Sequence, residues 1–421
     1  MSRLNNKASS GPFSTVCVVG LGYVGLPTAA IMASRGLKVL GVDTNVLAVD
    51  LINQGKVHII EPDLDILVNG AVAMGKLKAA VIPGAADAFI IAVPTPFKDD
   101  HVPNLSYVEA AAHAIAPFLQ TGNLVIIEST SPVGTTEQLS KWLAVDRPDL
   151  TFPHNNQNDS DICVAHSPER VLPGRVLIEL VSNDRVIGGI TEKCAERAGA
   201  LYDQVIDGKS LLTTARTAEL VKLAENAYRD VNIAFANELG NVCYDMDIDV
   251  WKAIELANHH PRVNILAPGP GVGGHCIAVD PWFIVDGAPD QTPLIQAARL
   301  VNDLKPRSIV AQIKAAAGKI NSPTVACLGL AYKADIDDLR ESPAVDITRQ
   351  VFDLGITVLA VEPHVNVLPK KLTGVQKTDL EDAVNRADII VLLTDHSQFK
   401  NMDKALLTGK TVIDSRGIWR S

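Results

Sequence analysis

The chain has 421 residues, of which 47% are hydrophobic and 20% are charged, and its formal net charge at pH 7 is -10. This length is too great for one hydrophobic core and predicts two or three domains of ordinary globular composition. The acidic charge argues against a nucleic-acid or membrane-surface partner. A phosphorylated ligand remains compatible with it, because a local cluster of amides and cations can hold phosphate.

Residues 1–14 are polar and small, which predicts a flexible tail without a signal peptide. No apolar run reaches the length needed to span a bilayer. The six cysteines include no CxxC pair and no His spacing typical of zinc, so no metal is expected, and a reducing cytoplasm is the expected location. These cysteines are Cys17, Cys163, Cys194, Cys243, Cys276 and Cys327.

Residues 15–212 alternate short aliphatic runs with helical patterns such as 107–119 and 135–143. Near-continuous aliphatic runs are typical of strands buried on both faces, and strand-helix alternation predicts a parallel sheet with helices on both sides. The expected strands are Thr15–Gly20, Lys38–Val42, Ala88–Val93, Leu124–Glu128, Ile162–His166 and Arg185–Gly189.

The pattern then becomes all-helical over residues 213–318. One long helix is expected from Thr214 to Tyr244, followed by helices near 249–258 and 292–317. The exposed face of the long helix is a candidate dimer contact. Strands return in residues 319–421, near 324–333, 356–361, 388–393 and 411–414. The predicted fold is therefore α/β, with two Rossmann-like doubly wound parallel sheets joined by an all-helical central domain.

The first strand leads into a glycine turn, Gly20-x-Gly22-x-x-Gly25, at the start of a helix. The first glycine allows the turn, the second admits a pyrophosphate and the third permits close helix packing. Asp43 ends the second strand eighteen residues after Gly25, where a ribose-binding carboxylate is expected. No Arg or Lys follows it directly, so NAD is favoured over NADP. The alternative is a strand-helix turn without a ligand.

The segment PGPGVGGHCIAVDP (268–281) places Cys276 in a loop rich in Gly and Pro, whose backbone N–H groups can cradle a ligand. The other cysteines lie in strand or helix patterns typical of small buried hydrophobes. Cys276 is therefore the one candidate nucleophile, with an ordinary loop thiol as the alternative. His275 is either its base or a loop residue.

The glycine turn, Lys222-x-x-x-Asn226 on the long helix, the GGHC loop with Asp280, and a C-terminal α/β domain occur in that order. From about Thr15 to the C-terminus the chain resembles the UDP-glucose/GDP-mannose dehydrogenase family. The resemblance implies an NAD-dependent, four-electron oxidation of a primary alcohol to a carboxylate. A cysteine thiolate traps the intermediate aldehyde, and the second oxidation leaves a thioester that water hydrolyses.

By family position Cys276 is the nucleophile, and Lys222 stabilises the oxyanion with Asn226 one helical turn away. Asp280 and Thr130 would orient water or the thiol. The catalytic candidates are thus Cys276, Lys222, Asn226, Asp280, Glu169 and Thr130. The cofactor-binding candidates are Gly20, Gly22, Tyr23, Val24, Gly25, Asp43, Pro94, Thr95 and Thr130.

Glu169 matches the family's candidate base for hydrolysis, with a surface acid paired to Arg170 as the alternative. UDP-glucose enzymes have a second glutamate four residues later, where this chain has Pro173, so a mechanism that needs both carboxylates is in doubt.

The C-terminal domain lacks a GxGxxG turn, which makes it a poor second NAD site, and the family places UDP there. Lys333 and Arg340 would bind the diphosphate. Arg262 resembles an arginine that reaches the neighbouring subunit's sugar site, which implies a homodimer. The substrate-binding candidates are Glu169, Arg170, Val171, Lys222, Asn226, Arg262, Gly273, Gly274, Lys333 and Arg340.

Five phrases are most similar to family members that oxidise UDP-N-acetyl-D-mannosamine for bacterial surface polysaccharides such as enterobacterial common antigen. They are PTPFK (94–98), ESTSPVG (128–134), SPERVLPG (167–174), residues 260–285 and DLRESPA (338–344). UDP-N-acetylglucosamine, UDP-glucose and GDP-mannose stay open as substrates. More distant alternatives are a two-electron β-hydroxyacid or 6-phosphogluconate-type dehydrogenase, which would lack the loop thiol and the C-terminal domain, and a non-catalytic NAD sensor.

Overall fold

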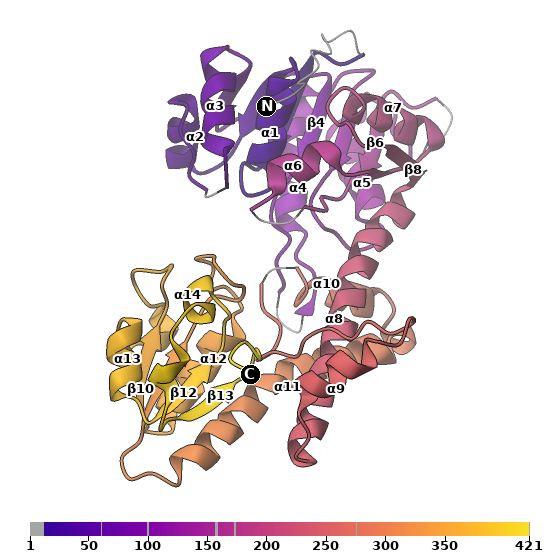
Figure 1. The fold of residues 1–421 in the computed structure, drawn as a ribbon. Coiled ribbons are helices and arrows are strands. Elements are labelled where there is room, and N and C mark those ends of the chain that lie inside the picture. The colour runs from indigo at the N-terminus through magenta and orange to yellow at the C-terminus, as the bar shows by residue number, and fades with distance from the viewer. Residues whose placement is uncertain are drawn as a thin grey trace. The chain divides into compact units, whose positions relative to one another are not determined.

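The structure is a computed structural model of the chain and describes residues 12–59, 61–98, 101–155, 159–171, 174–274 and 276–420. Most of the predicted tail, Pro173 and His275 therefore lie outside the described residues. The chain forms two compact units, Met1–Ala224 and Glu225–Ser421, each described by itself below (Figure 1). The division falls within one long helix, and the predicted boundaries of a separate central domain remain a prediction. No helix in the described part of the chain is long and apolar enough to cross a membrane.

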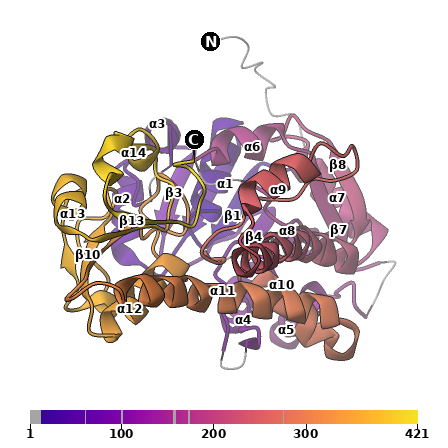
Figure 2. The ribbon, with the colours of Figure 1, turned by 60° about the horizontal axis from the view of Figure 1, so that its bottom comes forward.

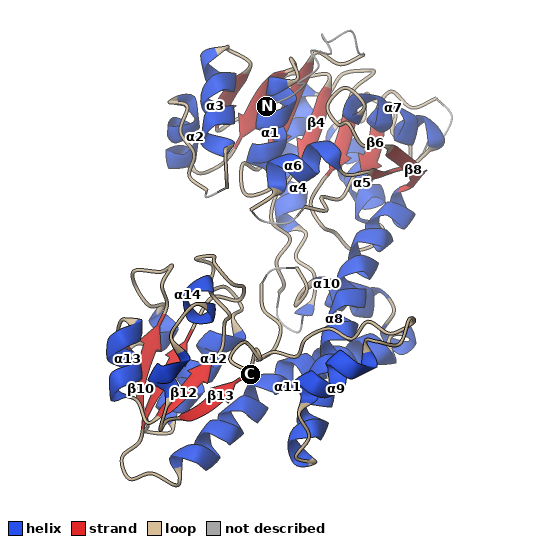
Figure 3. Cartoon of the chain, viewed as in Figure 1, coloured by secondary structure: helices blue, strands red, loops and turns tan. Residues whose placement is uncertain are grey.

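The first unit contains an eight-stranded sheet in the order β3-β2-β1-β4-β5-β6-β7-β8 (Figure 3). Strands β1 to β6 are mutually parallel in the order 3-2-1-4-5-6 of a dinucleotide-binding fold. The strands are β1 (Thr15–Val19), β2 (Lys38–Val42), β3 (Leu77–Ala80), β4 (Ala88–Ile91), β5 (Leu124–Ile127), β6 (Cys163–His166), β7 (Arg185–Gly189) and β8 (Ser210–Thr214).

Two features of this sheet differ from the sequence expectation. Strand β7 pairs with β6 antiparallel, through Ala165 with Gly189 and His166 with Gly188, although β7 and β8 are parallel to each other. The connection from β6 stays at the carboxyl edge of the sheet, so β7 enters from that edge. Edge strands β3 and β8 were not predicted, because LKAA and SLLTT are only partly buried and carry no continuous aliphatic run.

Helices cover both faces of this sheet, as predicted. One apolar core lies between the sheet and α1, α2, α3, α6 and α7, and the other between the sheet and α4 and α5 (Figure 2). The helices are α1 (Gly25–Ser34), α2 (Val46–Asn53), α3 (Leu64–Ala73), α4 (Ser106–Ile115), α5 (Thr135–Asp146), α6 (Val176–Ser182) and α7 (Glu192–Tyr202). Helix α8 (Ala215–Asp245) follows β8 and continues into the second unit.

The second unit joins helices to a five-stranded parallel sheet in the order β11-β10-β9-β12-β13. Helices α11 and α12 pack on one face and α13 and α14 on the other. The helices are α9 (Val250–Ala257), α10 (Asp280–Gly287), α11 (Pro293–Ala317), α12 (Pro343–Asp353), α13 (Leu380–Arg386) and α14 (Ser397–Lys400). The strands are β9 (Thr324–Leu328), β10 (Thr357–Val361), β11 (Gln376–Lys377), β12 (Ile389–Leu392) and β13 (Thr411–Asp414). The doubly wound α/β class is confirmed in both units.

A buried polar ladder joins α8 to α11 within this unit. Arg299 Nη1 lies 2.6 Å from Asp230 Oδ1, and Asn302 donates to the same oxygen at 2.8 Å. Asn237 donates to Asn302 at 2.9 Å, and Lys305 Nζ donates to the Asn237 carbonyl at 3.0 Å. Each of these buried charges has a specific partner, as burial requires, so the ladder fixes the register of the two longest helices.

Candidate active site

The turn between β1 and α1 has the backbone of a dinucleotide site. Gly20 has a φ of +93°, and a Cβ there would lie 2.4 Å from the Ala92 carbonyl oxygen. A Cβ on Gly25 would lie 1.8 Å from the Gly20 carbonyl oxygen, whereas a Cβ on Gly22 would meet no atom within 4 Å. The outer two glycines are therefore needed by the fold, and Gly22 leaves the open space that a pyrophosphate at the helix N-terminus needs.

These contacts predict opposite outcomes for two alanine substitutions. Gly22→Ala should keep the melting temperature of the unaltered protein while weakening NAD binding about tenfold or more, because the methyl fills the space for the pyrophosphate. Gly25→Ala should lower the free energy of unfolding by about 1–3 kcal/mol, as overpacking does. Thermal denaturation and NAD titration of both variants check this, and a destabilised Gly22→Ala protein with unchanged NAD affinity would contradict it.

Asp43 follows β2 and closes the same turn. Its Oδ2 accepts a hydrogen bond from the Leu21 amide at 2.9 Å, and its Oδ1 accepts one from the Asn45 amide at 2.8 Å. Its carboxylate thus lies at the carboxyl edge of the sheet beside the glycine turn. At the ends of the neighbouring strands, Thr95 Oγ1 donates to the Thr130 carbonyl at 2.6 Å, which brings two further cofactor candidates together.

The loop after β6 carries Glu169. The residue is half-buried, but its Oε1 is shielded from solvent and has no hydrogen-bond partner among the described residues. Burial raises the pKa of Glu169 above its usual value, although Lys222 and Arg185 act to lower it. This carboxyl is not the surface acid that was the alternative, and a raised pKa suits an acid-base role.

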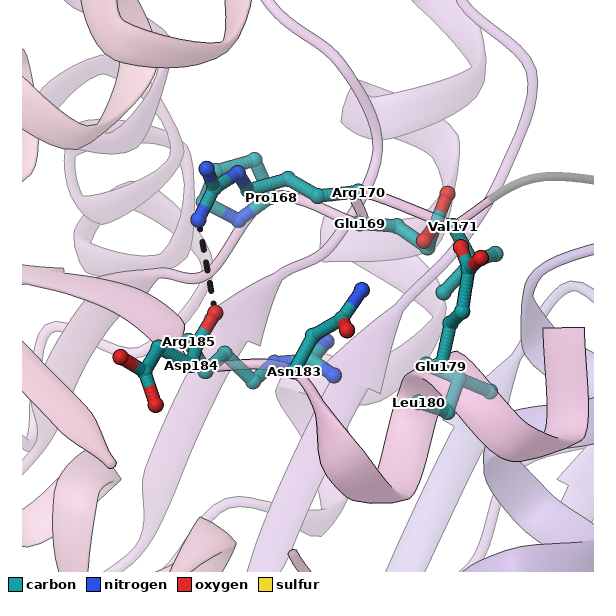
Figure 4. A pocket seen from close by; sticks show the side chains of 9 residues that line it. All are labelled: Pro168, Glu169, Arg170, Val171, Glu179, Leu180, Asn183, Asp184 and Arg185. Atoms are coloured by element: carbon teal, nitrogen blue, oxygen red, sulfur yellow. Dashed lines mark hydrogen bonds between the residues drawn. The ribbon is translucent and has the colours of Figure 1, made fainter. Parts of the chain in front are cut away.

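The surroundings of this loop can be followed in Figure 4. Glu169, Arg170 and Val171 line a small cavity of about 20 Å³, which has room for roughly one water. Arg170 Nη1 donates to the Asp184 carbonyl at 3.4 Å. Glu61 holds the far end of the loop, where α6 begins. Its carboxylate accepts hydrogen bonds from the amides of Gly174 at 2.9 Å and Val176 at 2.8 Å.

A buried polar network next to this loop was missed by the sequence analysis. Glu128, just after β5, accepts hydrogen bonds from Thr28 Oγ1 at 3.0 Å and Tyr202 OH at 2.8 Å, and it pairs with Arg185. Arg185 Nε in turn donates to Ser167 Oγ at 2.8 Å. The network ties α1, which begins at the dinucleotide turn, to the start of the loop that carries Glu169.

The thiol loop lies in the second unit. Cys276 is exposed, whereas the other five cysteines are buried. The Cys276 carbonyl accepts the Asp280 amide at 2.8 Å, and Asp280 Oδ2 accepts a hydrogen bond from Asn226 Nδ2 at 2.6 Å. Asn226 and Asp280 are both buried. Three predicted catalytic residues therefore form one connected group, in which α8 and the first turn of α10 hold the thiol loop.

The glycines of the thiol loop pack against the loop between β9 and α12. A Cβ on Gly273 would lie 2.5 Å from the Glu341 carbonyl oxygen, and one on Gly274, whose φ is +83°, would lie 2.8 Å from the Tyr332 ring. The Gly274 amide also donates to the Arg340 carbonyl at 3.3 Å. The predicted diphosphate loop, which also carries Lys333, is therefore a direct neighbour of the thiol loop.

Three arginines of this unit differ in their surroundings. The Arg340 guanidinium pairs with Asp338 at 2.6 Å. Arg416, after β13, was missed by the sequence analysis; its guanidinium lies against the backbone of Gly269, at the start of the thiol loop. Arg262 is exposed on the segment between α9 and α10.

The second sheet has its own acidic residue after the second strand. Glu362 follows β10 as Asp43 follows β2, but it is only 2% exposed. Its Oε2 accepts the amides of Leu330 at 2.7 Å and Ala331 at 2.9 Å. These bonds hold the buried carboxylate against the turn that follows β9.

One group of described residues, Asp335, His364 and His396, has ligand atoms within 4.8 Å of one another. The Asp335 amide donates to His396 Nδ1 at 2.9 Å, and His396 Nε2 lies 3.1 Å from Glu362 Oε2. Both ring nitrogens of His396 therefore have hydrogen-bond partners. The lone pair on Nδ1, which a metal ion would need, already accepts a hydrogen bond from a backbone N–H.

The predicted catalytic residues are divided between the two units. Glu169, Thr130 and Lys222 belong to the first unit, and Cys276, Asp280 and Asn226 to the second. Helix α8 runs through the division and carries Lys222 and Asn226 one helical turn apart.

Together the dinucleotide turn, the acid after β2 and the exposed loop thiol define a nicotinamide-dependent dehydrogenase with a candidate covalent nucleophile. Comparison with known proteins gives the family. Three domain models of the UDP-glucose/GDP-mannose dehydrogenase family match the chain: the NAD-binding domain at residues 14–206, the central domain at 216–304 and the UDP-binding domain at 326–421. The chain belongs to this family, and NAD is confirmed as its cofactor. It is an NAD-dependent nucleotide-sugar dehydrogenase.

Similar proteins cover nearly the whole chain. An NDP-N-acetyl-D-galactosaminuronic acid dehydrogenase of Ralstonia nicotianae is 60% identical over 97% of this chain and 96% of its own length. A UDP-N-acetyl-D-mannosamine dehydrogenase of Yersinia pestis is 55% identical over 97% of this chain and 100% of its own length. The solved structure of a UDP-D-ManNAc dehydrogenase from Pyrococcus horikoshii is 39% identical, with a TM-score of 0.88 over 97% of this chain and 96% of that one.

Proposed function

We propose that the enzyme oxidises C6 of UDP-N-acetyl-D-mannosamine to the carboxylate, with two NAD consumed per sugar. The observation that carries this proposal is the near full-length similarity to relatives that bear this name, at 54–58% identity. The product would be UDP-N-acetyl-D-mannosaminuronate, a precursor for bacterial surface polysaccharide of the enterobacterial common antigen type. The proposed location is the cytoplasm, where a thiol stays reduced.

A second candidate substrate follows from the relative at 60% identity, which is named for N-acetyl-D-galactosaminuronic acid. The two names differ in the stereochemistry of the sugar and share its N-acetyl group. A difference of two to six points in identity does not separate them, so an N-acetylated hexosamine on a nucleoside diphosphate is the common element of the proposal.

The proposed chemistry uses the thiol of Cys276 twice. After the first hydride leaves for NAD, the thiolate adds to the aldehyde and retains it as a thiohemiacetal; loss of the second hydride gives a thioester. Lys222 stabilises the oxyanion at each stage. The buried Asn226–Asp280 hydrogen bond supports the proposal that these residues hold the thiol loop, because Asp280 also bonds the Cys276 backbone. Glu169 then takes a proton from the hydrolytic water.

The nucleotide end of the substrate is proposed to lie on the loop between β9 and α12. The loop adjoins the thiol loop at Gly273 and Gly274, so a ligand bound there by its diphosphate would extend its sugar toward Cys276. Lys333 and Arg340 supply the cations.

A homodimer is proposed from the exposed apolar stripe on α8. Tyr228, Phe235 and Val242 follow one another at intervals of seven residues and are 70%, 56% and 45% exposed, so they share one face of the helix. Such a stripe on a long helix is typical of a subunit contact. Arg262, which is exposed and follows α8 in the sequence, would reach the partner's sugar site. Light scattering that finds an active monomer at assay concentration would rule out a shared site.

The substrate proposal is tested by initial rates of NADH formation. The panel is UDP-N-acetylmannosamine, UDP-N-acetylgalactosamine, UDP-N-acetylglucosamine, UDP-glucose and GDP-mannose. We expect kcat/KM to be highest for UDP-N-acetylmannosamine. A clear preference for UDP-N-acetylgalactosamine would favour the second candidate, and a preference for either hexose without the N-acetyl group would overturn both.

A further inference from the structure

His166 is a buried residue for which the proposed chemistry has given no role. It ends β6, its side chain is completely shielded from solvent, and neither Nδ1 nor Nε2 has a hydrogen-bond partner among the described residues. Leaving a buried polar group unpaired lowers the stability of the folded protein. Such a group in a native protein calls for a ligand or a functional explanation.

The sheet register shows which way the ring points. His166 lies opposite Gly188 in the antiparallel pair of β6 and β7, and directly opposite residues project to the same face. A Cβ on Gly188 would lie 2.4 Å from the Thr214 carbonyl oxygen and 2.6 Å from Ala218 Cβ. The His166 ring therefore faces the first turns of α8, and Lys222 lies one helical turn beyond Ala218.

The imidazole is neutral in this environment. Burial, together with the positive charges of Arg185 and Lys222, lowers its pKa to about 3. A neutral imidazole has one N–H donor and one unprotonated nitrogen that accepts. The side chains of Arg185 and Lys222 can donate hydrogen bonds but cannot accept them. Both therefore favour an unprotonated ring nitrogen, which can accept a hydrogen bond.

The second unpaired group belongs to Glu169, three residues after His166, in the loop that follows β6. Its Oε1 is shielded from solvent and has no partner among the described residues, and the positive charges of Lys222 and Arg185 act on its pKa as they do on that of His166. One imidazole and one carboxylate, each with an unpaired acceptor, thus lie within the electrostatic influence of the same lysine. Two acceptors near one cation can orient a water molecule for attack.

We propose that His166 is a positioning residue for thioester hydrolysis, with its unprotonated ring nitrogen and Glu169 holding the attacking water between them. This inference rests on the proposed thioester pathway. The water oxygen bonds to the thioester carbon, one water proton passes to the Glu169 carboxylate, and the C–S bond breaks to return Cys276 as a thiolate. The other water proton stays with the new carboxyl group, so atoms and charges balance.

The test separates the hydride steps from hydrolysis by rapid-mixing measurement of NADH. In His166→Phe, which keeps the ring volume and removes both nitrogens, we expect the first two NADH per active site to form within about twofold of the normal rate. Steady-state turnover should fall roughly tenfold to a hundredfold, the usual cost of a misplaced reactant. The sugar acyl group should accumulate on Cys276, visible by mass spectrometry. In His166→Asn, whose amide oxygen can accept from water, part of the turnover should return.

His154→Phe is the matched control, because this half-buried imidazole in the same unit is already bonded to Ser140 Oγ at 2.7 Å. It should leave both phases unchanged. Equal slowing of the hydride and hydrolysis phases in the folded His166 variants, or unchanged turnover, would overturn the role of His166. If the unaltered enzyme itself gives one NADH per sugar and no adduct on Cys276, the thioester pathway fails instead.

Discussion

Replacement of Cys276 by alanine is expected to reduce net formation of the sugar acid by about four orders of magnitude or more, as loss of a covalent nucleophile does. Hydride cannot leave an aldehyde until a nucleophile has added to it, so the second oxidation has no route without the thiol. Binding of NAD and of the sugar nucleotide should persist, because the glycine turn after β1 and the loop between β9 and α12 are unchanged. Acid formation by quenched assay and ligand binding by calorimetry provide the measurement.

The other cysteines supply the control for this experiment. Cys243 lies on α8 in the same unit and is 4% exposed, so Cys243→Ala removes a buried sulfur without touching the thiol loop. It should retain turnover. Cys276→Ser should behave differently from Cys276→Ala, because a hydroxyl is a poorer nucleophile and forms an ester that hydrolyses slowly. Such an ester should persist on the protein, and full activity in Cys276→Ala would refute the reaction class.

In Glu169→Gln, thioester hydrolysis is expected to fall by roughly 10²–10⁴-fold, the range for loss of a general base. The first two NADH should still form, and the acyl group should remain on Cys276. Burial raises the pKa of Glu169 in the unaltered enzyme, and the base must be ionised to accept a proton. Turnover should therefore decline as the pH falls through a pKa above the usual glutamate value of 4.5, and this acidic limb should vanish in the variant.

Glu179→Gln is the control for Glu169→Gln, because Glu179 lines the same small cavity but its side chain is paired with Arg175 at 3.4 Å. It should keep normal turnover and the acidic limb. If Glu169→Gln retains full turnover while the acidic limb stays in place, another group is the base.

The fold could be predicted from the sequence where local signals were strong. The Gly20–Gly25 turn and the aliphatic strands led to a parallel sheet with helices on both faces, and the structure confirms this. The antiparallel placement of β7 could not be predicted, because Arg185–Gly189 has the same aliphatic pattern whichever way it runs. The polar ladder between α8 and α11 could not be predicted for another reason. Asp230 and Arg299 are 69 residues apart in the sequence and meet only in the folded chain.

The candidate site was predictable where residues stood out against their neighbours. Cys276 could be singled out because it lies among glycines, and Lys222 and Asn226 because the Lys-x-x-x-Asn motif on the long helix resembles that of the family. His166 could not, because it ends a buried strand and looks like one more strand residue. The signal that identifies it is the combination of complete burial with two unpaired ring nitrogens, which requires the structure. The buried pair of Arg185 and Glu128 could not be predicted either, because both residues lie at strand ends and look like ordinary strand residues.

We propose that a single active site removes four electrons from each sugar through a thioester. The most direct measurement is the end-point amount of NADH formed per UDP-N-acetylmannosamine supplied in limiting amount, with excess NAD and an aldehyde-trapping reagent present. We expect two NADH per sugar, complete conversion to the uronate and no trapped aldehyde. One NADH per sugar, with the aldehyde recovered by the reagent, would contradict it.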